Sequence, residues 1–85
     1  MHEILFTKQA YKALRKIPRN EAQRIREKIE LLSTDPNAPN PNVKKLTGRS
    51  GYRLRVGDWR IIYEIRKEEL IILVLKIAPR GEVYK

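Results

Sequence analysis

The chain has 85 residues with no cysteine and a single histidine, and 19 lysines and arginines outnumber 10 aspartates and glutamates for a formal net charge of +9. A chain of this length holds one domain around one hydrophobic core, so we assign residues 1–85 to a single domain. The absence of cysteine excludes disulfides, a thiolate zinc site and a cysteine nucleophile, and one histidine cannot build a histidine metal site. We therefore expect neither a metal nor a cofactor.

No segment has the length expected of a membrane span or a secretion signal. The longest apolar run, residues 70–75, is about a third of the roughly 20 residues that cross a bilayer. The first residues lack the long apolar stretch of a signal peptide. We expect a cytoplasmic protein that makes no membrane contact.

The excess of positive charge indicates a polyanionic partner. Eleven of the 19 basic residues lie from residue 43 onward, so the positive field is concentrated in the second half of the chain. Such a surplus attracts nucleic acid and makes binding strongly salt-dependent, because bound cations release counterions from the phosphate backbone. The residues alone do not distinguish DNA from RNA.

The first half of the chain predicts one strand followed by two helices. Residues 2–6 are apolar enough for a short strand. Thr7 can cap a helix over Lys8–Ile17, whose apolar positions recur at helical spacing, and a proline follows. Asn20 and Gln23 form a capping-box pattern, which predicts that a second helix begins there.

The second half predicts an antiparallel meander of three strands. After a loop rich in proline and asparagine over residues 33–42, the hydrophobic period changes to two in Tyr52–Val56. Gly57-Asp58 suits a two-residue type II′ turn, and Trp59–Arg66 is the returning strand. The aliphatic run Leu70–Ile77 predicts a central strand covered on both faces. The order β-α-α-β-β-β indicates an α+β fold, an antiparallel sheet packed on an N-terminal helical hairpin.

The two-residue turn also fixes which residues face one another across the predicted hairpin. Arg55 falls opposite Arg60, and Arg53 falls opposite Ile62. Because side chains alternate between the faces of a sheet, the three arginines share one face. The other face packs on the helices with Tyr52, Leu54, Val56, Trp59, Ile61 and Tyr63. Like charges directly across a strand pair are unfavourable by several tenths of a kcal/mol, so their presence favours a role in binding anions.

Further basic residues lie on either side of the hairpin. Lys44, Lys45 and Arg49 lead into it, and Arg80 follows the last predicted strand. An ordinary solvated sheet face accounts for the same residues without any ligand. A phosphate-binding face is the sharper interpretation, because the arginine fork pairs with two phosphate oxygens and stays charged at every biological pH.

Three segments, KKLTG at residues 44–48, GYRLRVGDWRIIYEI at 51–65 and APRGEVYK at 78–85, occur in this order. Together with the early strand and the two helices, they resemble the RelE/ParE superfamily of toxin–antitoxin toxins, and more closely its RelE branch. The resemblance covers nearly the whole chain. It implies a metal-independent, ribosome-dependent endoribonuclease that cleaves messenger RNA and so inhibits translation. It also implies a cognate antitoxin, whose acidic or amphipathic segment neutralises the toxin in a hetero-oligomeric complex.

The same resemblance implies which residues carry catalysis. RelE-type toxins use basic residues on the sheet, an arginine after the last strand and a C-terminal tyrosine. These positions fall on Arg53, Arg55, Arg60, Arg80 and Tyr84. The reaction is attack of an RNA 2′-hydroxyl on the adjacent phosphate, so Arg60 and Arg80 are expected to stabilise the transition-state charge. Tyr84 is expected to orient the 2′-hydroxyl or to stack on a base.

The sequence leaves the general base open. Some RelE-type enzymes have lysines at two of the arginine positions on the sheet, and many have a histidine where Pro79 stands here. Because arginine does not release its proton, catalysis rests either on electrostatics and positioning or on a lysine such as Lys44 or Lys45. These two lysines and Arg49 are otherwise expected to bind RNA.

Two other functions fit the same sequence. The first is a ParE-like toxin that inhibits DNA gyrase, although such proteins often lack the sheet arginines and the terminal tyrosine. The second is a basic module that binds RNA or the ribosome without cutting, because no histidine, cysteine or paired-carboxylate site marks the chain as an enzyme.

Overall fold

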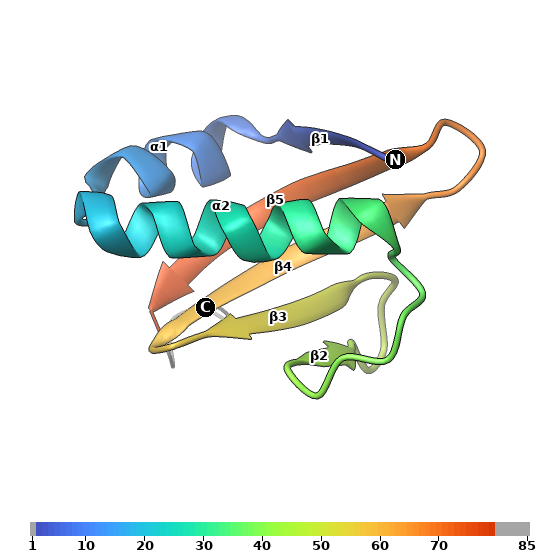
Figure 1. Ribbon diagram of the computed structural model, residues 1–85. Helices are drawn as coiled ribbons and strands as arrows, with labels where there is room; N and C mark the ends of the chain where they lie inside the picture. Colours follow the sequence, from blue (N-terminus) through green and yellow to red (C-terminus); the bar gives the residue numbers. More distant parts are fainter. Residues whose placement is uncertain (1, 80–85) are drawn as a thin grey trace.

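The computed structural model describes residues 2–79, which form two helices and one five-stranded sheet. In chain order the elements are β1 (Glu3–Phe6), α1 (Lys8–Lys16), α2 (Arg19–Thr34), β2 (Val43–Lys45), β3 (Tyr52–Val56), β4 (Trp59–Arg66) and β5 (Ile71–Pro79). Both helices cover the same face of the sheet (Figure 1), which confirms the expected α+β class. Neither helix in this described range is long and apolar enough to cross a membrane.

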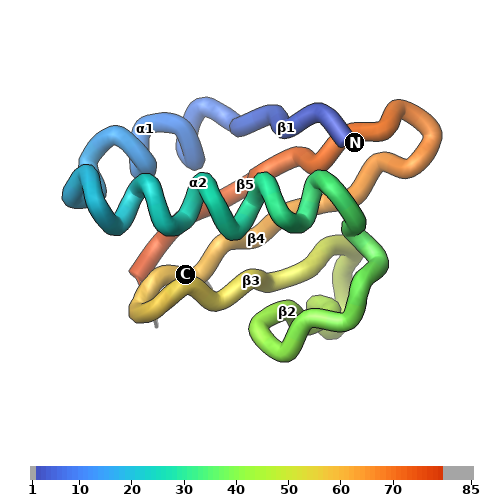
Figure 2. Tube along the Cα trace, in the orientation of Figure 1, coloured from blue at the N-terminus to red at the C-terminus, as the bar shows by residue number. Residues whose placement is uncertain are grey.

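The strands lie in the order β1-β5-β4-β3-β2, which can be followed along the trace in Figure 2. Strands β2 to β5 pair antiparallel with their neighbours, and this confirms the predicted meander. β1 pairs in parallel with β5, because the helices and three strands between them return the chain in the same direction. The sheet is therefore mixed, and β4 occupies its centre.

The expectation that the last strand is covered on both faces is wrong. In β5, Ile72 and Val74 are buried beneath the helices, whereas Ile71, Leu73 and Leu75 are half-buried. A sheet with both helices on one side leaves its other side more open to solvent. The aliphatic composition of the strand concealed this difference.

Helix α1 begins where the sequence predicted. Thr7 Oγ1 accepts a hydrogen bond from the backbone N–H of Ala10 at 3.2 Å and so caps the helix. The same hydroxyl donates to the carbonyl oxygen of Leu75 at 2.7 Å. Thr7 therefore links the junction of β1 and α1 to β5.

The start of α2 differs from the expected capping box. The helix begins at Arg19 with Pro18 as its N-cap, and no side chain caps it. Gln23 Nε2 donates instead to Glu27 Oε1, one turn further along, at 3.3 Å. The capping box on Asn20 and Gln23 is therefore wrong. Proline has a fixed φ that suits helix entry, and the carbonyl of Pro18 accepts a backbone hydrogen bond at 2.9 Å.

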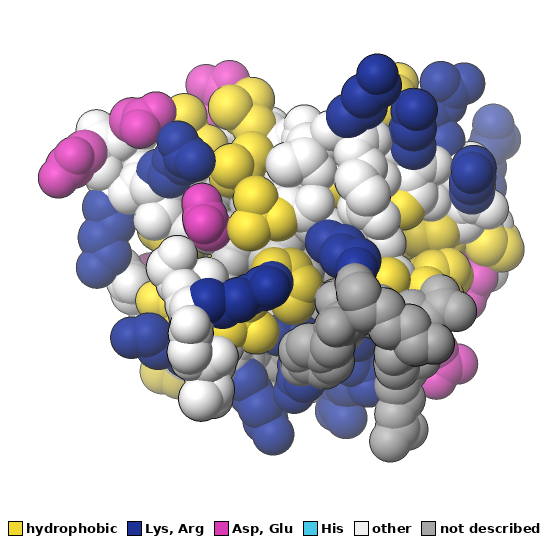
Figure 3. Space-filling model, turned by 180° about the vertical axis from the view of Figure 1, so that it is seen from behind, with side chains coloured by type: hydrophobic (Ala, Val, Ile, Leu, Met, Phe, Trp, Pro, Cys, Tyr) yellow, Lys and Arg dark blue, Asp and Glu magenta, His cyan; other side chains and the backbone are white. Residues whose placement is uncertain are grey.

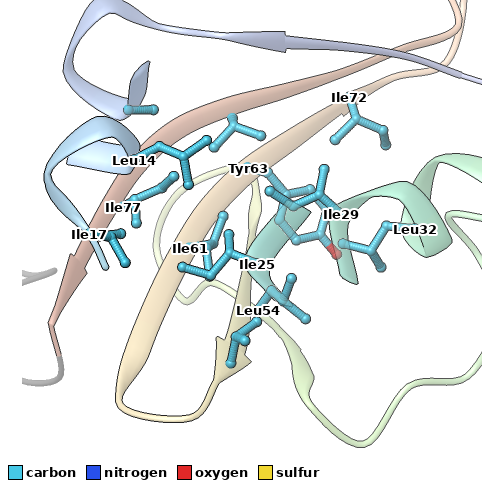
Figure 4. Close-up of a cluster of buried hydrophobic side chains, with 13 residues drawn as sticks. Leu14, Ile17, Ile25, Ile29, Leu32, Leu54, Ile61, Tyr63, Ile72 and Ile77 are labelled. Atoms are coloured by element: carbon cyan, nitrogen blue, oxygen red, sulfur yellow. The ribbon is translucent and has the colours of Figure 1, made fainter. Parts of the chain in front are cut away.

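A single apolar core joins the helices to the sheet (Figure 4). From the helical hairpin it takes Leu14, Ile17 between the two helices, Ile25, Ile29 and Leu32, and from the sheet Leu54, Ile61, Tyr63, Ile72 and Ile77. The six side chains predicted to face the helices all belong to this core or pack against it. Burying each large aliphatic side chain contributes about 1.5–3 kcal/mol. This burial commits the alternate side chains of β3 and β4 to the opposite face.

The β3–β4 hairpin has the predicted register. Arg55 pairs with Arg60, and Arg53 pairs with Ile62. Gly57 has a φ of 58°, and Asp58 is not among the positive-φ residues of the described chain. This is the pattern of a type II′ turn, in which the first central residue alone has positive φ.

Strand β2 was not predicted. It pairs with the outer edge of β3, and its three residues are too few for an alternating pattern to be recognised. In the loop between the two strands, Gly51 has a φ of 114°, and its carbonyl accepts a hydrogen bond from Leu46 N at 3.1 Å. A Cβ at this position would lie 3.0 Å from the carbonyl oxygen of Tyr63, so the loop requires glycine.

Candidate nucleic-acid interface

The sheet face turned away from the helices carries the arginines that the sequence placed together. Near the hairpin it carries five cations, which we name the arginine face: Lys44 on β2, Arg53 and Arg55 on β3, Arg60 on β4 and Lys76 on β5. Arg66 projects on the same side at the far end of β4, beside Glu64. Figure 3 shows this side of the molecule, on which lysine and arginine side chains lie beside apolar ones. The grouping follows from register, because directly paired residues project on the same side of a sheet.

The register arranges these cations in two adjacent rows across the strands. The first row runs through Lys44, Arg53, Ile62 and Lys76 on β2 to β5. The second row holds Arg55, Arg60 and Ala78. Diagonal neighbours in the two rows lie about 7–8 Å apart, so one extended polyanion can meet both rows.

Hydrogen bonds hold Arg55 and Arg60 in place. Arg55 Nη2 donates to Asn42 Oδ1 at 3.1 Å, and the backbone N–H of Arg55 donates to the carbonyl of Asn42 at 2.8 Å. Arg60 Nη1 donates to the carbonyl oxygens of Gly57 and Trp59, at 3.0 Å each. A guanidinium has five N–H donors, so the bond to Asn42 leaves other donors of Arg55 for a ligand. Anchoring both side chains before binding reduces the entropy that binding costs.

A small apolar floor lies among the cations. Ile62 and Ala78 are buried on this side of the sheet, and Leu46 and Leu75 pack against them. Leu75 is the additional residue of a β-bulge, since Ile62 pairs with Lys76 while the next residue of β4 pairs with Val74. Cations around an apolar floor suit a nucleotide chain, whose phosphates and flat bases need different surfaces.

The basic residues before the hairpin converge on a cavity beside the arginine face. The cavity has a volume of about 310 Å³ and is lined by Lys44, Lys45, Leu46, Thr47, Arg49 and Arg53. The structure therefore brings the three lead-in residues of the sequence analysis next to Arg53. Their positions extend the positive surface beyond the outer edge of β3.

Negative charge is scarce on these strands. Glu64 is the one acidic residue within β2 to β5, and its Oε1 atom lies 3.6 Å from Arg66 Nη2. Within residues 2–79, no group of histidines and carboxylates could hold a metal ion. The chemistry that the described face offers is that of guanidinium and ammonium groups.

Sequence reasoning missed Lys76. It lies inside an aliphatic run that was interpreted as covered on both faces, whereas the structure places it half-buried in the first row, opposite Ile62. The one charge in that run was the signal. The predicted residues Arg80 and Tyr84 lie outside the described residues.

On the helix side of the same strands, Tyr63 is 1% exposed, and its ring stacks on that of Tyr52 with 5.5 Å between centroids. Burial, and to a smaller extent the neighbouring Tyr52, raises the pKa of Tyr63 to about 12. Its hydroxyl has no hydrogen-bond partner in the described part of the chain. Tyr63 is thus a packing residue beneath the arginine face.

Comparisons with known proteins agree on one superfamily. The family model of the ParE toxin of type II toxin–antitoxin systems, parDE, matches residues 4–84. The curated relative RelE1 of Methanocaldococcus jannaschii is 32% identical over 80 residues, which cover 92% of this chain and 89% of the relative.

Solved structures give the same result. An archaeal RelE–RelB complex from Pyrococcus horikoshii contains a chain that is 30% identical, with a TM-score of 0.78 over 96% of this chain and 98% of that one. The isolated RelE toxin of Escherichia coli, at 22% identity, shares the fold with a TM-score of 0.81 over 99% of this chain and 92% of that one.

Proposed function

We propose that this chain, which belongs to the RelE/ParE superfamily of toxins from type II toxin–antitoxin systems, stops translation by cleaving messenger RNA on the ribosome. The observation that carries the proposal is the anchored pair Arg55 and Arg60, directly opposite one another on the arginine face. Two guanidinium groups side by side repel each other in the free protein. They fit a phosphate that each can contact through two oxygens.

The proposed reaction needs no metal. The RNA 2′-oxygen forms a bond to the adjacent phosphorus, the bond from phosphorus to the 5′-oxygen breaks, and a 2′,3′-cyclic phosphate and a 5′-hydroxyl result. A base takes the proton of the 2′-hydroxyl, and a donor gives one to the leaving 5′-oxygen. Arg53, Arg55 and Arg60 hold the RNA in line and stabilise the negative charge on the phosphorane.

Arg80 and Tyr84 complete the proposed site. Arg80 follows the last residue of β5 in the sequence and is assigned to charge stabilisation near the leaving oxygen. Tyr84 is assigned to orienting the 2′-hydroxyl or to stacking on a base. Lys76 joins Lys44 and Lys45 as a candidate base, because an amine, unlike a guanidinium, can be tuned to release a proton.

The antitoxin partner follows from the relatives. The similar structure from Pyrococcus horikoshii is a RelE–RelB complex. For this chain we propose a cognate antitoxin that neutralises the arginine face with an acidic or amphipathic segment, in a hetero-oligomeric complex. Because the proposed substrate lies on translating ribosomes, we also propose a cytoplasmic location.

Primer extension on one messenger, with and without translating ribosomes, tests the function. Cuts confined to the translated region in the presence of ribosomes support the proposal. Because the matching family model describes a ParE toxin, the same preparation is assayed for loss of DNA supercoiling by gyrase. Intact messenger with inhibited gyrase identifies the gyrase-directed function, and ribosome binding without cuts identifies the non-catalytic module.

A further inference from the structure

A second basic concavity opens where α2 passes the β3–β4 turn. This helix–hairpin cleft has a volume of about 400 Å³, and six polar residues line it: Arg24, Lys28, Asn42, Arg55, Asp58 and Arg60. Arg24 and Lys28 are four residues apart on α2 and so project from the same side of the helix. None of the predicted RNA-binding residues came from a helix, and the cleft therefore extends the basic surface to an element that the sequence did not implicate.

The charges in the helix–hairpin cleft are poorly balanced. Four cations line it with one carboxylate, Asp58. In the described part of the chain, neither Arg24 nor Lys28 forms an ion pair, although Glu21, Glu27 and Glu30 lie on the same helix. Both cations are exposed and take no part in the core. Like charges gathered in one concavity raise the local potential and attract an anion.

The cleft is continuous with the arginine face. Arg55 and Arg60 belong to both, and their side chains are anchored by Asn42 and by the carbonyls of Gly57 and Trp59. A polyanion that contacts these two arginines on the sheet can therefore continue around the hairpin to Arg24 and Lys28.

The lining indicates which kind of anion fits. Val56 is the one large apolar residue of the cleft. An amphipathic acidic peptide needs apolar anchors in desolvated pockets, and this cleft offers little for them. A phosphodiester backbone needs charged donors and no apolar pocket.

We propose that Arg24 and Lys28, together with Arg55 and Arg60, form a second phosphate-binding site for the backbone of RNA. That the ligand is RNA rests on the proposed function. The backbone has two sources: the messenger next to the scissile phosphate, or the RNA of the ribosome. Arg24 and Lys28 bind and position this RNA and take no part in the bond-breaking step.

The test compares two double substitutions that remove the same charge at the same helical spacing. Arg24→Gln with Lys28→Gln changes the cleft, and Lys8→Gln with Lys12→Gln changes the exposed side of α1. Affinities of the full chain are measured from about 50 to 200 mM salt. One probe is a short single-stranded RNA with methylated 2′-hydroxyls, and the other is the purified small ribosomal subunit. Circular dichroism confirms that each variant folds.

We expect the cleft substitution to weaken binding about 10-fold or more beyond the α1 control. Each lost phosphate contact lowers the salt slope by about 0.7 for single-stranded RNA, so the slope falls by about 1.4. The single substitutions Arg24→Gln and Lys28→Gln should each lower the salt slope by about half as much, about 0.7. A loss on both probes assigns the cleft to the messenger, and a loss confined to the ribosomal subunit assigns it to ribosomal RNA.

Equal behaviour of the two double variants on both probes overturns the inference. A loss of affinity confined to the complex with the antitoxin also overturns it, because the cleft is then a protein-binding surface. The proposed function can fail independently of this inference. An unmodified chain that binds RNA through the cleft but leaves translated messenger intact refutes cleavage, while the cleft remains an RNA-binding site.

Discussion

Replacing Tyr63 by phenylalanine should stabilise the protein. The hydroxyl of Tyr63 is buried and has no hydrogen-bond partner in the described chain. Leaving a buried polar group unsatisfied costs about 1–3 kcal/mol, and the substitution removes that cost while keeping the ring. In a domain of this size, each kcal/mol shifts the melting temperature by about 4–8 °C. We therefore expect a rise of at least about 4 °C in a thermal melt.

The pH dependence adds a second measurement. The pKa of Tyr63 is 10.0 without its protein surroundings and about 12 in the fold, because burial opposes ionisation. Folding thus favours the neutral form of Tyr63. Its contribution to the free energy of unfolding is complete below pH 10 and is lost as the pH rises toward 12. Tyr63→Phe lacks this loss, and its advantage over the unmodified chain should grow across that window.

The control is Tyr52→Phe, which keeps the stacked pair of rings and removes the hydroxyl of a half-buried residue. It should shift stability much less than Tyr63→Phe. A melting temperature that falls in Tyr63→Phe would show that the hydroxyl is satisfied. An advantage that shrinks above pH 10 would show that burial does not oppose its ionisation, and either result refutes the reasoning.

Three further substitutions test the framework that holds the arginine face, each by chemical denaturation. Thr7→Ala should cost about 1–2 kcal/mol, because the helix cap and the bond to the Leu75 carbonyl are both lost, whereas Thr7→Ser should keep both. Gly51→Ala should cost at least about 2 kcal/mol, because its Cβ meets the carbonyl of Tyr63, and Gly48→Ala, with open space around it, should cost about half as much or less. Leu70→Asn should gain about 0.5–1 kcal/mol, because Leu70 is exposed and has a φ of 56° that asparagine tolerates better. Equal effects of the two glycine substitutions, a loss in Thr7→Ser as large as in Thr7→Ala, or a loss in Leu70→Asn would each contradict the corresponding argument.

The sequence was most informative where local geometry determines long-range order. A two-residue turn at Gly57-Asp58 fixes the register of β3 and β4, and register fixes the face of every side chain along them. The arginine pair and the helix-facing core were therefore predictable before any tertiary contact was known.

Features set by tertiary contacts were not predictable in this way. The parallel pairing of β1 with β5 depends on the path that the chain takes after the two helices. The short strand β2 is stabilised by pairing with β3. Lys76 faces outward because the helices cover one side of the sheet, a fact absent from its local pattern. The helix–hairpin cleft joins Arg24 to Arg55 across distant parts of the chain, and no spacing rule connects them.

The central claim is that anchored arginines on the sheet face cleave messenger RNA on the ribosome. The most direct measurement is the rate of messenger cleavage, by primer extension with translating ribosomes, for Arg60→Ala and for Arg66→Ala. Both substitutions remove one arginine from β4, but Arg66 is exposed at the end of the strand, beside Glu64. Losing one charge-stabilising donor commonly lowers the rate about 10²–10³-fold, so Arg60→Ala should fall by that factor while Arg66→Ala stays near the unmodified rate. Cleavage by folded Arg60→Ala at the unmodified rate, or equal losses in both variants, would contradict the account.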